Sequence, residues 1–258
     1  MGTSPQALRV RGSRLERLRV TLADGASTTL HLASFHTGAF RARVALLEEP
    51  APLAHWCAEQ GVEHAVVGGF FVRPGAQPLG ELRVGGEAVP SVPFDAPWRG
   101  LRACVQATDG SVLIGRRPDF GHEPPGDLLQ AGPLLVANGR PAFFEGEDVE
   151  GFSAGSAQFD SDITVGRYPR TALALIGDLL VAAVCDGRGE SDAGMSLAEL
   201  AWTLIQLGAS DALNLDGGGS ASLVHGGRLR NRPREEHGID LLDGRPVVSA
   251  IVFEPRLS

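Results

Sequence analysis

The chain has 258 residues, of which 43% are hydrophobic and 21% are charged, and its formal net charge is -8 at pH 7. This length allows one large domain or two small ones with a full hydrophobic core. The negative charge and the lack of any arginine-rich run argue against binding to nucleic acid or to an anionic membrane surface. No segment approaches the roughly 18 consecutive apolar residues of a membrane-spanning helix.

Residue usage narrows the class of protein further. The 34 glycines and 17 prolines, with only 6% aromatic residues, are typical of many short strands and tight turns rather than a helix bundle. All 23 basic residues are arginine, so a single arginine is weaker evidence for phosphate binding than usual. Cys57, Cys104 and Cys185 have neither metal-ligand nor disulfide spacing, which predicts buried thiols in a reducing compartment.

The N-terminal segment contains no apolar core of a signal peptide, so the sequence as it stands predicts a cytoplasmic protein. A longer natural chain that carried a signal would instead be secreted or reside in the cell envelope. The sequence leaves the oligomeric state open.

Short elements fill the first two thirds of the chain. Alternating apolar residues predict a hairpin first, and an apolar run before two glycines predicts a buried strand. The acidic, Gly/Ser-rich stretch 145–167 predicts a long surface loop or lid. In chain order the predicted elements are strands 17–22 and 28–33, a helix at 52–59, strand 64–67, hairpins at 79–92 and 102–114, a loop at 116–127 and one apolar strand at 128–136.

The C-terminal third has the clearest pattern. Ser196 and Glu199 form a capping box that opens an amphipathic helix ending at Gly208. Strands are predicted at 170–176, 179–185, 212–215, 221–224 and 247–253. The fold class predicted is α+β (mixed α/β), a single domain with a mostly antiparallel mixed sheet flanked by a few helices. Residues 1–60 would be a strand-rich part of the same domain as residues 61–258.

The stretch from Ala212 to Val224, ALNLDGGGSASLV, raises the question of function. A phosphate-binding P-loop needs a lysine, and a dinucleotide-binding loop needs a following helix, yet neither is predicted here. An EF-hand pattern is also absent. What remains is a loop whose backbone N–H groups could approach a ligand closely, with Asp216 at its start. The alternative is a tight turn or bulge with no role in binding.

Several short motifs in a fixed order strengthen the functional interpretation. They are Gly68-Gly69-Phe70-Phe71, Gln130-Ala131-Gly132-Pro133-Leu134-Leu135-Val136 with Asn138-Gly139, Tyr168-Pro169-Arg170-Thr171-Ala172, Asp186-Gly187-Arg188, Gly194-Met195-Ser196-Leu197-Ala198-Glu199-Leu200-Ala201, Leu207-Gly208-Ala209, Ala212-Leu213-Asn214-Leu215-Asp216-Gly217-Gly218-Gly219-Ser220, Asn231-Arg232-Pro233 and Arg245-Pro246-Val247-Val248. This series, spanning roughly residues 60–254, resembles the phosphodiester glycosidase family. One departure is Val67, which stands where the family usually has asparagine.

The resemblance implies a hydrolase that cleaves the bond between a sugar's anomeric carbon and a phosphodiester. Animal members of the family release N-acetylglucosamine, and bacterial members are associated with exopolysaccharide. The substrate expected here is therefore a sugar phosphodiester, in a glycan or an envelope polysaccharide. No nucleic-acid or membrane partner is expected.

Three residues are the candidate catalytic groups. Asp186 and Asp216 each follow a buried strand and would emerge at one sheet edge if those strands are neighbours. One would act as nucleophile or base and the other as an orienting partner or acid, and Arg170 would offer phosphate a bidentate fork. As structural alternatives, Arg170 would pair with a surface acid, Asp186 would cap its turn, and Asp216 would serve the turn alone.

A wider set of residues is expected to contact substrate. Its members are Gly68, Gly69, Phe70, Gly132, Thr171, Arg188, Asn214, Gly217, Gly218, Gly219, Ser220, Arg232 and His237. No residues have transition-metal spacing, so no cofactor or metal is expected, with a loop-bound calcium as the alternative. Val67 motivates a second hypothesis, a non-catalytic glycan- or sugar-phosphate-binding module. A third is a purely structural or interaction protein, in which Arg170, Asp186 and Asp216 would lie far apart.

Overall fold

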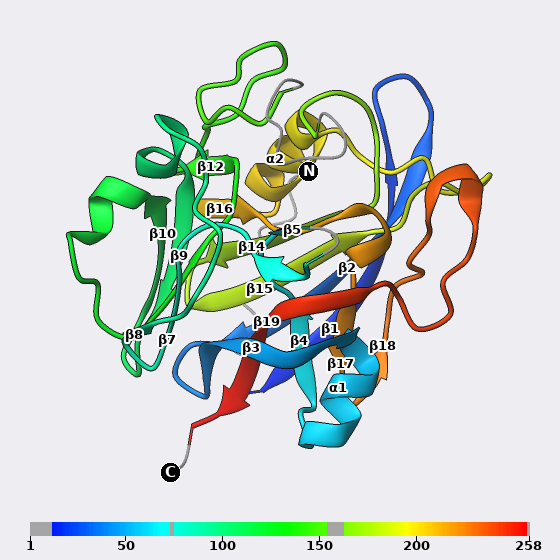
Figure 1. The fold of residues 1–258 in the computed structure, drawn as a ribbon. Helices are drawn as coiled ribbons and strands as arrows, with labels where there is room; N and C mark the ends of the chain where they lie inside the picture. Colours follow the sequence, from blue (N-terminus) through cyan, green and yellow to red (C-terminus); the bar gives the residue numbers. More distant parts are fainter. Residues whose placement is uncertain (1–11, 73–74, 154–162, 257–258) are drawn as a thin grey trace.

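A computed structural model describes residues 12–72, 75–153 and 163–256 (Figure 1). The chain forms three main antiparallel sheets and a small hairpin. The first sheet contains, in spatial order, β1 (Ser13–Thr21), β2 (Ser27–His36), β15 (Leu179–Cys185), β14 (Arg170–Ile176), β16 (Asp211–Asn214), β12 (Leu134–Ala137) and β13 (Arg140–Pro141). The second contains β18 (Arg228–Leu229), β17 (Leu223–His225), β4 (His64–Val67), β19 (Pro246–Pro255) and β3 (Phe40–Pro52).

The third sheet lies to one side of the other two. It contains β10 (Val112–Arg116), β9 (Ala103–Ala107), β11 (Asp127–Gln130), β7 (Leu82–Val84) and β8 (Glu87–Ala88), and β5 (Phe71–Val72) pairs with β6 (Gln77–Pro78). Short 3-10 turns occur at η1 (Trp98–Gly100), η2 (Arg117–Phe120), η3 (Gly218–Ser220) and η4 (Glu236–Gly238). The strands dominate the described part of the chain.

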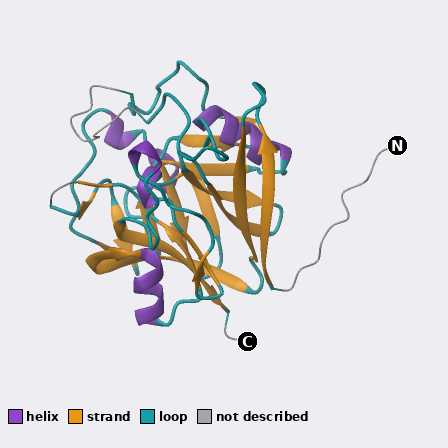
Figure 2. Ribbon diagram, turned by 90° about the vertical axis from the view of Figure 1, so that its right-hand side faces the viewer, coloured by secondary structure: helices purple, strands orange, loops and turns teal. Residues whose placement is uncertain are grey.

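The predicted helical flanks are the main correction to the fold class. Among the described residues the α-helices are α1 (Leu53–Gln60) and α2 (Leu197–Gln206), and each covers the outer face of a different sheet. Figure 2 shows both outside the strands. The fold is therefore predominantly β, with three separate sheets instead of one mixed sheet. Both helices lie where the sequence predicted them, with Gly61 and the Ser196–Glu199 capping box at their ends.

The strand predicted over 128–136 is in fact two strands in different sheets. β11 pairs with β9 in the third sheet, whereas β12 pairs with β16 in the first. The break falls at Gly132, which has a left-handed φ of 123°. Pro133 follows and has no N–H to continue a ladder. The apolar run concealed this break because both strands are buried, so side-chain polarity did not change between them.

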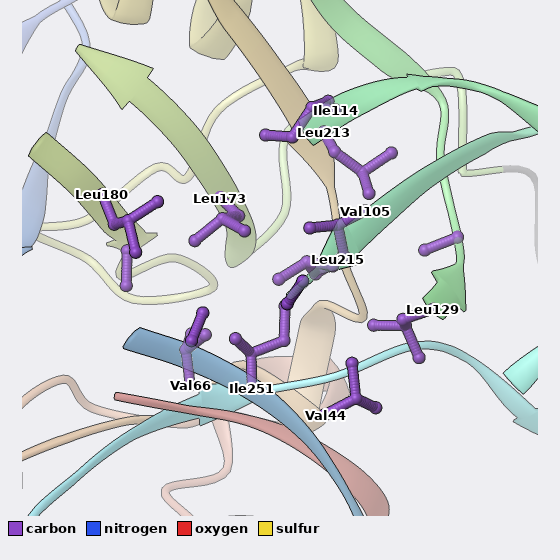
Figure 3. Close-up of a cluster of buried hydrophobic side chains, with 14 of the residues drawn as sticks. Val44, Val66, Val105, Ile114, Leu129, Leu173, Leu180, Leu213, Leu215 and Ile251 are labelled. Atoms are coloured by element: carbon purple, nitrogen blue, oxygen red, sulfur yellow. The ribbon is translucent and has the colours of Figure 1, made fainter. Parts of the chain in front are cut away.

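The main core lies where the three sheets meet. Figure 3 shows Leu173 and Leu180 of the first sheet facing Val66 and Ile251 of the second, with Leu213 of the first sheet beside Ile114. Val105, Ile114 and Leu129 close the cluster from the third sheet. A smaller core lies between α2 and the first sheet, and another between α1 and the second. This packing fixes the ends of the central strands.

A histidine pair at the end of the second sheet should make stability depend on pH. His225 and His64 have ring centroids 4.5 Å apart, and Phe35 packs against both rings. Burial, the neighbouring His64 and then Arg230 lower the pKa of His225 to about 4. Burial also lowers the pKa of His64, against the opposing effect of Glu63.

A lowered histidine pKa stabilises the fold above the unfolded-state pKa near 6.5, and this contribution is lost as pH falls toward 4. We expect a loss on the order of 1 kcal/mol per pH unit over this window, because solvent at the exposed side of the ring screens part of the effect. Urea unfolding between pH 4 and 8 measures it. His225→Phe should reduce the slope, whereas a change at the exposed His122 should leave it intact; equal slopes for all three proteins would contradict this account.

Candidate active site

The strands that carry the candidate catalytic residues end at one edge of the first sheet. β15 and β16 both pair antiparallel to β14, which lies between them. They therefore run in the same direction and finish at the edge where β14 begins with Arg170. Asp186 and Asp216 follow those two strands. The shared edge agrees with the expectation, although the two strands are separated by β14 instead of being direct neighbours.

The loop Gly217–Ser220, called the glycine loop below, packs closely on the backbone that enters β14. The N–H of Gly218 donates to the carbonyl of Pro169 at 2.8 Å. A Cβ at Gly217 would lie 2.8 Å from that same oxygen and 3.7 Å from the Cα of Arg170. Gly218 also has a left-handed φ of 58°. The loop contains one 3-10 turn, η3, where the sequence predicted irregular structure.

A second segment reaches the loop from the second sheet. The N–H of Asp216 donates to the carbonyl of Gly68 at 3.0 Å. Gly68 leaves no room for a side chain, because a Cβ there would lie 2.5 Å from Ser249 Oγ. Gly69 donates its N–H to the same hydroxyl. The structure thus brings Gly68 to the site, and Ser249 is the observed reason for glycine there.

The carboxylate of Asp216 lies at the start of the loop and is half-buried. Its Oδ1 accepts the N–H of Gly217 at 2.9 Å, which orients the side chain along the loop. The turn therefore uses one of its oxygens. This placement fits both a catalytic carboxylate and the structural alternative.

The carboxylate of Asp186 is buried and fully engaged. Oδ2 lies 2.9 Å from His31 Nε2, and Oδ1 accepts the backbone N–H of Arg232 at 2.7 Å. Both side chains of the His31–Asp186 pair are only 7% exposed. The backbone of Asp186 is held as well, because Thr28 Oγ1 donates to its carbonyl at 2.6 Å. This geometry suits a carboxylate that positions its neighbours.

Removing the Asp186 carboxylate should therefore destabilise the fold. Asp186→Ala leaves His31 and the Arg232 N–H without a buried acceptor, and we expect a loss of about 3 kcal/mol in the free energy of unfolding. The matched control is Asp178→Ala, since Asp178 lies 2.8 Å from His36 but is 68% exposed. That change should cost under about 1 kcal/mol. Equal losses in urea unfolding would show that the buried pair has no special weight.

The two candidate arginines differ in their surroundings. Arg170 is buried and donates to the carbonyls of Met195 and Gly166, at 3.1 and 3.2 Å. Arg188 has a left-handed φ of 57°, and a terminal nitrogen of its guanidinium donates to the carbonyl of Arg234 at 3.2 Å. A Cβ at Gly218 would lie 3.5 Å from one of the terminal nitrogens of Arg188. Arg188 is thus the arginine seated on the loop, and a phosphate contact for Arg170 stays a prediction.

Three of the residues expected to contact substrate are buried polar side chains. Thr171 Oγ1, Ser220 Oγ and Asn214 Oδ1 have no hydrogen-bond partner within the described ranges. The amide nitrogen of Asn214 donates to the carbonyl of Gly132 at 2.9 Å. A Cβ at Gly132 would lie 2.7 Å from Glu150 Oε2. The carbonyl of Gly132 therefore accepts a hydrogen bond from Asn214, and the Glu150 carboxylate fills the space that a side chain at position 132 would need.

The remaining predicted contacts are spread more widely. Phe70 lies in the main core, 5.7 Å from the ring of Phe152. The side chain of Arg232 is exposed, and only its N–H joins the Asp186 cluster. His237 is exposed in η4. Val67 packs in the core beneath α1, so its side chain belongs to the outer layer of the second sheet.

Sequence reasoning missed three residues that the fold brings to this site. His31 comes from β2, 155 positions away from Asp186. Glu235 and Arg245 form an ion pair beside Gly219. Arg245 belongs to the motif Arg245-Pro246-Val247-Val248, which gave it no predicted role. The signal available for Glu235 was its place in the charged pair Arg234-Glu235. His31 gave no local signal, because it occupies one position in an ordinary strand.

Within residues 12–72, 75–153 and 163–256, no group of three or more His, Cys, Asp or Glu side chains could hold a metal ion. Over the same ranges, neither α-helix has the length and apolar character needed to cross a bilayer.

Comparisons with known proteins agree with the motif series. A family model described as phosphodiester glycosidase matches residues 60–254. The catalytic domain of zebrafish N-acetylglucosamine-1-phosphodiester alpha-N-acetylglucosaminidase, auto-inhibited by its pro-peptide, superposes with a TM-score of 0.72 at 19% identity, over 99% of this chain and 87% of that one. A hypothetical protein from Synechocystis gives 0.66 at 20% identity, over 95% and 62%. No curated protein gives a significant match.

Proposed function

Because this chain belongs to the phosphodiester glycosidase family, we propose that it hydrolyses the bond between the anomeric carbon of a sugar and a phosphodiester, in a glycan or an envelope polysaccharide. The observation that carries the proposal is the placement of Asp216 beside the Gly217–Ser220 loop, with Arg188 seated on the same loop. A carboxylate and a cation from two different segments of the chain thus lie beside the same short loop.

The chemistry of the proposed substrate matches this pairing. Hydrolysis breaks the bond from the anomeric carbon to oxygen, and the oxygen leaves with its electron pair as part of a phosphate monoester. That leaving group is a stable anion, so it needs little protonation, unlike the alcohol released by ordinary glycosidases. Water supplies the hydroxyl of the free sugar, and its second proton passes to a base.

Asp216 is the group we assign to the anomeric carbon or the attacking water, as nucleophile or base. We assign Asp186 the role of positioning partner, because His31 and the Arg232 N–H already engage both of its oxygens. Arg188 and the backbone N–H groups of the loop would meet the phosphate. Arg170 would then hold together the segments that precede β14 and α2, through its contacts to the carbonyls of Gly166 and Met195.

The sugar proposed for a first test is N-acetylglucosamine, which the name of the zebrafish protein specifies for that enzyme. The assay measures free N-acetylglucosamine released from its 1-phosphodiester. The expected result is release of the sugar together with an equal amount of phosphate monoester. A matched substrate with the same sugar joined to an alcohol should react far more slowly, because its leaving group needs a proton.

Failure across a panel of sugar phosphodiesters would contradict the hydrolase assignment. Saturable binding of a sugar phosphate without turnover would then favour the binding-module hypothesis. Val67 is a weak argument for that hypothesis, since its side chain packs in the core beneath α1. The hydrolase is the function that the site supports best.

A further inference from the structure

One carboxylate in the candidate site lies between two arginines. Glu235 pairs with Arg245 through both carboxylate oxygens, including a contact of 2.6 Å from an Arg245 terminal nitrogen to Oε2. The same Oε2 lies 3.8 Å from a terminal nitrogen of Arg188. All three side chains are partly sheltered, with exposures of 17% for Arg188, 20% for Arg245 and 30% for Glu235.

This arrangement is pressed against the glycine loop. A Cβ at Gly219 would lie 2.7 Å from Glu235 Oε1 and 3.1 Å from an Arg245 terminal nitrogen. A Cβ at the preceding Gly218 would approach Arg188 at 3.5 Å. Because these glycines have no side chains, Arg188 can lie beside Gly218, and Glu235 and Arg245 can lie beside Gly219. The backbone N–H of Arg245 also donates to the carbonyl of Gly219 at 3.1 Å, which ties Arg245 to the loop.

Glu235 is hydrogen-bonded by one guanidinium and lies 3.8 Å from a second, whose nitrogen donates to the carbonyl of Arg234 at 3.2 Å; a phosphate oxyanion beside the loop would meet the same two groups. Guanidinium groups bind carboxylate and phosphate through the same planar pairs of N–H donors, so the two anions compete for them. A phosphate carries more charge and more acceptor oxygens than a carboxylate. It would therefore gain more from two arginines than Glu235 does.

We propose that Arg188 and Arg245 form a two-arginine phosphate subsite on the glycine loop, and that Glu235 is its internal counter-ion, displaced when the phosphate binds. The proposal rests on the function proposed above and adds a regulatory element to it. When the subsite holds no phosphate, the negative charge of Glu235 offsets the repulsion between the guanidinium groups of Arg188 and Arg245. It also limits how tightly the phosphate monoester product is held, which favours product release.

The alternative is that Glu235 and Arg245 form a purely structural ion pair. Their segment supports a second pair nearby, because Arg234 donates to Asp240 at 2.7 Å. A structural pair, however, predicts that loss of Glu235 weakens the loop and weakens anion binding with it. The counter-ion role predicts the opposite sign.

The experiment measures binding of inorganic phosphate by titration calorimetry to the full chain and its variants. We expect Glu235→Gln to bind phosphate about 10-fold more tightly than the native chain, because the competing charge is removed and the side-chain shape is kept. Adding Arg245→Gln or Arg188→Gln to that variant should reverse the gain. The matched control is Glu254→Gln, since Glu254 pairs with Arg41 on the second sheet at 2.9 Å. It should leave phosphate binding unchanged.

Equal or weaker phosphate binding by Glu235→Gln would overturn the proposal. If this variant folds poorly, single Arg245→Gln and Arg188→Gln changes decide instead, because each should weaken phosphate binding about 10-fold or more. No effect from either arginine change would equally overturn it. Phosphate binding requires no turnover, so failure of sugar release would count against the proposed hydrolase while leaving this result readable.

Discussion

Asp216→Asn should lower kcat for sugar release at least about 10³-fold while leaving the fold intact. The amide keeps the shape of the side chain and can still accept the N–H of Gly217 through its oxygen, as Oδ1 does now. It carries no negative charge and is a poor nucleophile and base. The turn should therefore survive the change, and the chemistry should not.

Three measurements together separate the catalytic role of Asp216 from the structural alternative. Initial rates on an N-acetylglucosamine 1-phosphodiester give kcat and KM, and urea unfolding gives the free energy of unfolding. A catalytic role predicts a large fall in kcat with little change in KM or stability. A turn that merely needs an acceptor predicts nearly native rates for the asparagine variant. Asp211→Asn is the matched control, because that aspartate lies at the other end of β16 and accepts the N–H of Asn138.

Gly132→Ala should be among the most destabilising single substitutions in this chain, at about 3–5 kcal/mol. The new Cβ would lie 2.7 Å from Glu150 Oε2 and 3.0 Å from the Phe152 ring, at a φ of 123°. The carboxylate cannot easily move aside. Its oxygens accept the N–H groups of Leu134 and Ala103, each at 2.8 Å, and so link the first sheet to the third.

The control for Gly132 isolates crowding from backbone strain. Gly139 also has a left-handed φ, 72°, but a Cβ there would meet nothing within 4 Å. Gly139→Ala should cost only the strain of that conformation, about 1 kcal/mol. Chemical denaturation of the two variants against the native chain gives both values. Similar losses would mean that Glu150 and Phe152 yield to the new methyl group.

The glycine and capping signals allowed much of the fold to be predicted from the sequence. Gly61 ends α1 in a left-handed conformation, and Ser196 with Glu199 starts α2, as those residues indicated. These features are local, so a few neighbouring residues determine them. The separation of β11 from β12 was missed, because a buried strand looks the same in either sheet.

The candidate site shows the limit of local signals more clearly. The edge shared by Asp186 and Asp216 could be anticipated from two strands ending in aspartate. The contacts of the Asp186 carboxylate could not be anticipated in this way, because His31 reaches it only through the pairing of β2 with β15. The Glu235–Arg245 pair likewise depends on how the segment between β18 and β19 folds back on itself. Such contacts are set by the pairing of distant strands, which carries no signature in a single sequence.

The pairing of β2 with β15 shows that the boundary of the family model differs from the boundary of the folded unit. The family model begins at residue 60, yet β15 has β2 as its partner along its whole length, and β19 is paired with β3. A chain cut at the family boundary would lose both partner strands and His31. It would present two long, apolar strand edges of the kind that drive aggregation. The span matched by the family model is thus shorter than the folded unit, and the match to the zebrafish catalytic domain, which covers 99% of this chain, includes these N-terminal strands.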